Sequence, residues 1–147
     1  MLDQKDHAIL ALLKYDCKKT IREISSSTHL SPTAVYERIK KLETSGIIEA
    51  YTIKINKKKT GKLLSAFCQI SLEVHRKDVI EKFEKEIACL DEVIACYHLA
   101  GIMDYLLHVT VSDMNAYQEF LKNKLATMEN IRKVQSSFVM TEVKYDI

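Results

Sequence analysis

Apolar residues in about the first 45 positions recur every three or four residues, which is the spacing of helices that bury one face. The pattern predicts helices over residues 3–15 and 20–28, and a third that starts after Ser31. Ser31 can cap this third helix, Pro32 suits its first position, and Gly46 suits the stop beyond its last residue. Three helices with a tight turn before the last predict a helix-turn-helix, with a plain three-helix bundle as the alternative.

The next segment is expected to complete this half of the chain. Residues 47–55 suit two short strands that form a wing. Residues 56–61, NKKKTG, contain turn formers, consecutive lysines and no apolar residue. We therefore expect a helix-turn-helix domain over residues 1–55, a linker over 56–62 and a second domain over 63–147.

The hydrophobic period changes in the second half. Alternation and helical spacing there predict six elements in the order β-α-β-β-α-β, which are strands over 64–74, 93–99, 105–111 and 133–145 and helices over 78–90 and after Asp113. This order is that of a ferredoxin-like sandwich. The whole chain is therefore expected to be an α+β protein, with an N-terminal winged helix-turn-helix joined to a C-terminal ferredoxin-like domain.

A four-stranded sheet with both helices on one face leaves its other face uncovered. We expect the chain to associate with itself through that face. The residues expected there, or their neighbours, are Phe67, Gln69, Ile94, Cys96 and His98.

The charge is divided unevenly. Residues 1–62 carry 13 Lys and Arg against 7 Asp and Glu, a net charge of +6, whereas residues 63–147 carry a net charge of −4. This asymmetry indicates that the first half meets a polyanion.

Other classes find little support in the sequence. The four cysteines form no CxxC pair, so neither a zinc site nor a disulfide framework is expected, in keeping with a reducing cytoplasm. The first residues lack the apolar region of a secretory signal, and no apolar run is long enough for a membrane span. We find no phosphate loop, nucleophile–base pair or metal spacing, so neither catalytic residues nor a cofactor is predicted.

Several short motifs carry a family resemblance over essentially the whole chain. The motifs are Leu30-Ser31-Pro32-Thr33, Glu37-Arg38-Ile39, Leu42-Glu43, Gly46-Ile47-Ile48 and Ala50-Tyr51 in the first half, and residues 101–107 (GIMDYLL), 112–117 (SDMNAY) and 138–144 (FVMTEVK) in the second. With the order of elements, they resemble the Lrp/AsnC (feast/famine) transcription regulators. The Gly-x-x-Asp-Tyr-Leu-Leu and Asp-Met-x-Ala-Tyr runs look particularly like the leucine-responsive branch.

The resemblance implies oligomers built from dimers through the second domain, often tetramers or octamers. It also implies an amino-acid effector bound between dimers near residues 101–104. The sequence departs from the family at His29, where a glycine is common and a positive φ would have to be tolerated. It departs again at residues 129–131, Glu-Asn-Ile, where relatives have a Pro-Gly-Val turn.

The resemblance and the helix pattern together nominate DNA-binding residues. These candidates are Arg22, Ser31, Thr33, Tyr36, Glu37, Arg38, Lys40 and Lys41. The lysines and Arg22 suit phosphates, although any one of them can equally be a solvated surface residue. Glu37 can accept from a cytosine amino group or pair with a neighbouring lysine. For Arg38, structural pairing with Glu43 or the first helix is favoured over base reading.

The candidate effector-binding residues cluster in one loop. They are Leu99, Ala100, Gly101, Ile102, Met103 and Asp104, with Ser136 added from the last strand. Gly101 suits either an unusual backbone shape or close approach of a ligand. Asp104 can hold an amino-acid ammonium, fix loop amides that bind the carboxylate, or simply cap the turn before the strand.

These observations predict a cytoplasmic, sequence-specific regulator that binds double-stranded DNA and is modulated by a small effector, which we expect to be an amino acid. Two rivals are an amino-acid-sensing module that binds an enzyme or another regulator, and a ferredoxin-like enzyme with an appended helical domain. The net charge of +6 on the first half argues against both.

Overall fold

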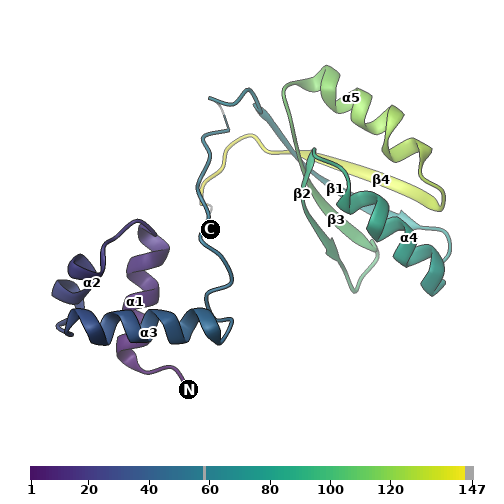
Figure 1. Cartoon of the computed structure of the whole chain (residues 1–147). Helices are drawn as coiled ribbons and strands as arrows, with labels where there is room; N and C mark the ends of the chain where they lie inside the picture. The colour runs from purple at the N-terminus through teal and green to yellow at the C-terminus, as the bar shows by residue number, and fades with distance from the viewer. Residues whose placement is uncertain (58, 145–147) are drawn as a thin grey trace. The chain divides into compact units, whose positions relative to one another are not determined.

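The computed structural model describes residues 1–57 and 59–144, which form two compact units (Figure 1). The first unit ends at Lys54 and the second begins at Ile55. Each unit has a hydrophobic core of its own. None of the helices in these ranges is long and apolar enough to cross a lipid bilayer.

The described residues of the first unit form three helices, which are α1 (Gln4–Tyr15), α2 (Ile21–Thr28) and α3 (Pro32–Thr44). Each helix begins where a side chain accepts a hydrogen bond from a first-turn amide, and the three capping residues are Asp3, Thr20 and Ser31. The apolar stripes meet in a core of Ile9, Leu13, Ile24, Val35 and Leu42.

The turn between α2 and α3 uses a left-handed residue. His29 has a φ of 56° and ends α2, and its amide donates to the carbonyl of Ser25. The positive φ expected at this position is thus adopted without a glycine. Together α2, this turn and α3 form the predicted helix-turn-helix.

The two short strands predicted over residues 47–55 are absent from the described structure, which is a correction. After α3 the amides of Ile47 and Ile48 both donate to the carbonyl of Leu42 at 3.0 Å, so the chain closes back on the helix end. The hydroxyl of Tyr51 then donates to Glu43 at 2.7 Å. The backbone of this segment pairs with the end of α3 and not with a second strand.

The second unit is an antiparallel sheet with two helices. Its elements in chain order are β1 (Leu64–Leu72), α4 (Lys77–Ala88), β2 (Val93–His98), β3 (Tyr105–Val111), α5 (Met114–Asn123), the 3-10 turn η1 (Leu125–Thr127) and β4 (Ile131–Phe138). The sheet order is β2-β3-β1-β4. The predicted ferredoxin-like fold class is confirmed, and the element order agrees.

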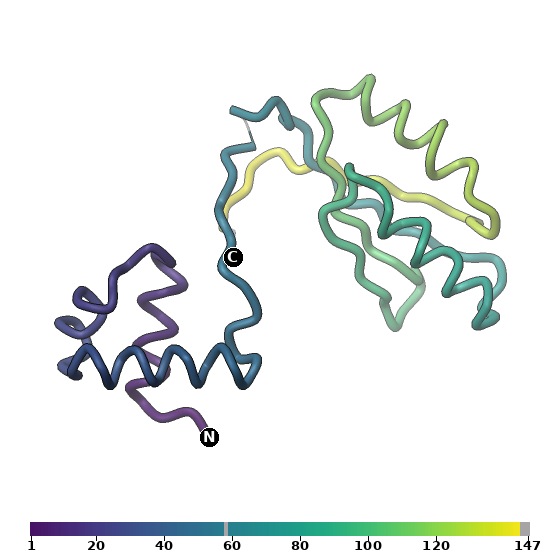
Figure 2. The backbone as a smooth tube through the Cα atoms, viewed as in Figure 1, coloured from purple at the N-terminus to yellow at the C-terminus, as the bar shows by residue number. Residues whose placement is uncertain are grey.

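Helices α4 and α5 cover one face of the sheet (Figures 1 and 2). Alternate residues of β1 and β3 point into the core beneath them, and the largest fully buried side chains there are Tyr105, Tyr117, Phe83 and Phe120. Phe67 and Gln69 of β1 fall on the opposite, uncovered face, as predicted. On β2, neighbours of the named residues take that face, the alternative that the prediction leaves open, because Cys96 and His98 lie on the helix-covered face. They pair with Leu107 and Tyr105, whose side chains lie under the helices.

The last strand is shorter than predicted. β4 ends at Phe138, and the amide of Val139 makes one further bond to the carbonyl of Ser65 at 2.9 Å. Residues 139–144 form no strand, and Tyr145, the predicted end, lies outside the described residues. The extended residues of this tail therefore do not continue the strand.

Candidate DNA-binding helix and ligand cavity

The solvent-facing side of α3 carries most of the predicted DNA-binding residues. Those whose side chains are exposed are Thr33, Tyr36, Glu37, Lys40 and Lys41. Residues three or four positions apart share a helix face, so this set forms one continuous strip. The Lys40 ammonium lies 5.9 Å from the centroid of the Tyr36 ring, within reach of a cation–π contact.

The other three candidates, Arg22, Ser31 and Arg38, lie outside this strip. Arg22 is exposed on α2. The hydroxyl of Ser31 accepts the amide of Ala34 at 3.2 Å, so it serves as the cap of α3. Within the described ranges Glu37 forms no ion pair with Lys40 or Lys41, so the pairing considered for it is not observed.

Arg38 is occupied by the first helix. Its guanidinium contacts Asp3 at 2.7 Å and Asp6 at 2.6 Å. The capping hydrogen bonds between Asp3 and Asp6, and then the guanidinium, lower the pKa of both carboxyls, and the two carboxylates raise the pKa of Arg38. The charge of Arg38 therefore joins α1 to α3, which is the structural pairing with the first helix predicted in preference to base reading.

A cavity of about 520 Å³ lies against the uncovered face of the second unit, where the loop between β2 and β3 meets β1 and β4. The structure brings five of the seven predicted effector residues to it. The lining residues are Gln69, Leu99, Ala100, Gly101, Ile102, Met103, Lys133 and Gln135. The main-chain amides of residues 100–103 donate no hydrogen bond within the described structure. Four residues that line the cavity therefore carry amides without an acceptor in the described structure.

Gly101 has no steric role in the fold. Its φ is not positive, and a Cβ built on it meets no atom within 4 Å. An unusual backbone shape therefore does not explain this glycine. Space for a ligand against the main chain is the alternative that the geometry allows.

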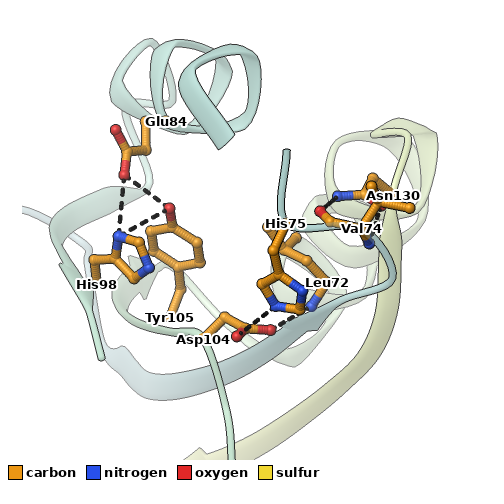
Figure 3. A network of polar contacts seen from close by, with 8 residues as sticks. All are labelled: Leu72, Val74, His75, Glu84, His98, Asp104, Tyr105 and Asn130. Carbon is orange, nitrogen blue, oxygen red and sulfur yellow. Dashed lines mark hydrogen bonds and ion pairs between the residues drawn. The ribbon is translucent and has the colours of Figure 1, made fainter. Parts of the chain in front are cut away.

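Asp104 fastens the loop instead of lining the cavity (Figure 3). Its carboxylate accepts the amide of Leu72 at 2.7 Å and lies 2.9 Å from Nε2 of His75. Its own amide donates to Ile70 at 2.8 Å, and its carbonyl accepts the amide of Leu99 at 2.7 Å. Of the three roles considered for Asp104, fixing the loop that carries the amides is the one that these contacts support, because they tie the loop to β1.

The protonation of Asp104 fits this anchoring role. Burial would raise the pKa of its carboxyl, but the Leu72 amide and the His75 ring outweigh it and the pKa is lowered. Figure 3 also shows the neighbouring contacts of Asn130, whose side chain bonds both the amide and the carbonyl of Val74. The end of β1 and the start of the following turn are thus held from two sides.

Ser136 does not belong to the cavity, contrary to the prediction. It pairs with Cys68, which is fully buried under the helices, and its hydroxyl accepts from Tyr117 at 2.6 Å. Neighbouring strand residues point to opposite faces, so the cavity is lined by Gln135. Sequence reasoning missed Gln135, Lys133 and His75. Lys133 and Gln135 could have been found from their spacing of two within β4, which places both side chains on the same face, whereas His75 carries no such signal.

A second polar cluster lies under α4 at the edge of the sheet (Figure 3). The Tyr105 hydroxyl donates to Glu84 at 2.7 Å, and the His98 ring stacks on Tyr105 with centroids 4.5 Å apart. Burial and then the Glu84 charge raise the pKa of Tyr105. No group of three or more His, Cys, Asp or Glu among the described residues is arranged to hold a metal ion.

An exposed basic helix in a helix-turn-helix and a separate domain with a cavity define a DNA-binding protein that carries its own ligand-binding domain. Comparisons with known proteins agree. Residues 2–49 match a winged helix-turn-helix DNA-binding model, and residues 65–147 match the Lrp/AsnC ligand binding domain. The chain belongs to the Lrp/AsnC family of transcription regulators, and it is not an enzyme.

Similar proteins span nearly the full chain. The DNA-binding transcriptional activator DecR of Escherichia coli (strain K12) is 33% identical over 99% of this chain and 95% of its own length. The leucine-responsive regulatory protein of the same strain is 35% identical over 97% and 87%. The crystal structure of a transcriptional regulator from Neisseria meningitidis in complex with L-Met has a TM-score of 0.95 at 34% identity, covering 99% of this chain and 94% of that one.

Proposed function

We propose that the cavity beside residues 99–103 is the effector site of this regulator and that its effector is an amino acid. The observation that supports this most directly is the row of main-chain amides at residues 100–103, which lack acceptors within the described ranges and border the cavity. Such amides suit a carboxylate. The related regulator from Neisseria meningitidis was crystallised with L-Met, which is the same chemical class.

On the DNA side, we assign two roles to the exposed strip. Thr33, Tyr36 and Glu37 in the first turns of α3 reach base edges in the major groove, where a recognition helix reads sequence. Lys40 and Lys41, with Arg22 from α2, contact phosphates and release counterions. The protein acts in the cytoplasm, where its DNA lies.

We also assign self-association to the second unit. The uncovered face of the sheet carries Phe67, stacked on His108 with centroids 4.5 Å apart, and the exposed Tyr97. A second copy that packs on the part of this face around Phe67 and Tyr97 covers it with two-fold symmetry and leaves the end beside residues 99–103, where the cavity lies, open to the effector. Tetramers or octamers of such dimers place helix-turn-helix pairs on palindromic half-sites about one helical turn, or multiples of it, apart.

The test is size-exclusion chromatography with light scattering, with and without each of the twenty amino acids, combined with calorimetric binding. The decisive variant is Gly101→Val, because an added Cβ meets no atom of the fold within 4 Å and Gly101 lines the cavity. Ala126→Val, exposed and outside the cavity, is the matched control.

We expect one or a few amino acids to bind and to change the mass or the DNA affinity, since a ligand that prefers one assembly shifts the equilibrium toward it. Gly101→Val should lose this response and keep the thermal unfolding profile of the wild type. A response that survives in Gly101→Val would move the effector site elsewhere, and the absence of any response would refute amino-acid sensing.

A further inference from the structure

One charged side chain borders the cavity, that of Lys133 on β4. Its ammonium makes no hydrogen bond or ion pair with any residue in 1–57 or 59–144. An ammonium without a counter-charge at the wall of a cavity is available to a ligand. Two carboxamides, of Gln69 and Gln135, stand beside it and can donate as well as accept.

The strand register fixes the side from which Lys133 acts. Lys133 pairs with Ser71, and Gln135 pairs with Gln69, all on the uncovered face. β4 lies on one side of β1, and β3, which follows the loop over residues 99–103, lies on the other. Two inter-strand spacings separate β3 from β4, about 10 Å. The loop that leads into β3 and the strand that carries Lys133 therefore approach the cavity from opposite sides of β1.

The charge of the cavity is not balanced by any of its own residues. None of the lining residues is acidic. The carboxylate of Asp104, at the end of the same loop, is 16% exposed and already bound to the Leu72 amide and His75. The loop on one side, with its amides unpaired among the described residues, and a cation on the other leave both sides of the site favourable to negative charge.

We propose that the cavity selects a small dicarboxylate, with Lys133 as the residue that determines this specificity. This inference rests on the proposed effector site. One carboxylate meets the loop amides, and the second meets Lys133 between Gln69 and Gln135. An acidic amino acid and the corresponding 2-oxo diacid share this chemistry. A neutral amino acid such as methionine would displace water from the exposed Lys133 ammonium without supplying a charge in its place, which costs affinity.

The experiment is calorimetric titration of the full-length protein with ligand pairs that differ in charge but little in shape. The pairs are glutamate with glutamine and aspartate with asparagine, and 2-oxoglutarate, methionine and leucine complete the set. Each titration is repeated with Lys133→Met, which keeps the length of the side chain. The matched control is Arg132→Met, which removes the same charge from the neighbouring exposed residue that does not line the cavity.

A charge-assisted hydrogen bond in place of a neutral one predicts that glutamate or aspartate binds about tenfold more tightly than its amide partner. Lys133→Met should remove this preference, and Arg132→Met should keep it. Stronger binding of glutamate than of 2-oxoglutarate identifies the ligand as an acidic amino acid, and the reverse order identifies it as a 2-oxo diacid.

Two results would overturn the inference. If methionine, leucine or the amides bind as tightly as the diacids, or if Lys133→Met keeps the preference, the dicarboxylate assignment fails while the effector site itself stands. If none of these ligands binds the wild type, the dicarboxylate assignment fails, and the proposed site fails with it only if none of the other amino acids binds either.

Discussion

Replacing Asp104 tests whether a single carboxylate holds the cavity loop to the end of β1. The measured quantity is the exchange rate of the Leu72 amide, which donates to this carboxylate at 2.7 Å. Hydrogen exchange followed by NMR reports the free energy of local opening at that amide. Asp104→Ala removes the acceptor, and Asp104→Asn keeps a neutral one.

The magnitude follows from the two contacts. A hydrogen bond to a charged group contributes roughly 1.5 to 3 kcal/mol, and a neutral one about 1 kcal/mol. The contact with His75 adds little, because that side chain is 57% exposed and exposed ion pairs contribute about 0 to 1 kcal/mol. We therefore expect Leu72 exchange to accelerate about 10- to 100-fold in Asp104→Ala and about fivefold in Asp104→Asn.

The dependence on pH has a definite sign. The pKa of Asp104 is lowered below its ordinary value of 3.8, so its stabilising effect is complete above that pH and is lost as the pH falls through the lower folded value. Asp113→Asn is the control, since it removes the same charge while asparagine still caps α5. Equal Leu72 exchange in the wild type and both Asp104 variants would refute the anchoring role.

The remaining predictions concern charge. Arg38→Ala should lower the thermal unfolding temperature of the first unit and leave the salt dependence of DNA binding unchanged, because the contacts of Arg38 are with Asp3 and Asp6 at the start of α1. A weaker salt dependence in this variant would show that Arg38 contacts a phosphate. Lys40→Ala and Arg22→Ala should each reduce the slope of log DNA affinity against log salt concentration by about one, the value for one lost phosphate contact, measured by fluorescence anisotropy from low to moderate salt. Unchanged slopes would show that these two residues do not contact phosphates. Burial and then Lys57 lower the pKa of His108 below 6.5, so the unfolded chain binds more protons there and the unfolding free energy should fall as the pH drops through 6.5. His108→Gln should remove this dependence in denaturant titrations, and its persistence would assign it to another group.

Local chemistry made the helix boundaries and the order of elements predictable. The caps Asp3, Ser31 and Asp113 satisfy amides three residues ahead, and a sequence window of that size contains both partners. The cavity loop was predictable too, because its residues are contiguous. The absence of wing strands over residues 47–55 was not predictable, because alternation shows that a segment can form a strand but not that a partner strand exists.

Features that depend on distant partners were missed or misplaced. The facing of Ser136 is set by its register with Cys68, and a shift of one residue moves a side chain to the other face. His75 meets Asp104 across 29 positions of the chain, and nothing in its own neighbourhood indicates that contact. Lys133 and Gln135 acquire their place only because β4 pairs with β1.

The pairing of the first and last strands has a mechanical consequence. β1 and β4 are antiparallel neighbours, so the start of β1 and the end of β4 lie at the same end of the pair, where Ala66 faces Phe138. A pull between residues 63 and 139 would therefore break the hydrogen bonds between β1 and β4 one after another and not all at once. β4 would peel from Ala66 and Phe138 toward Leu72 and Ile131, and the strand that carries Lys133 would be the first part of the sheet to yield to a pull along the chain.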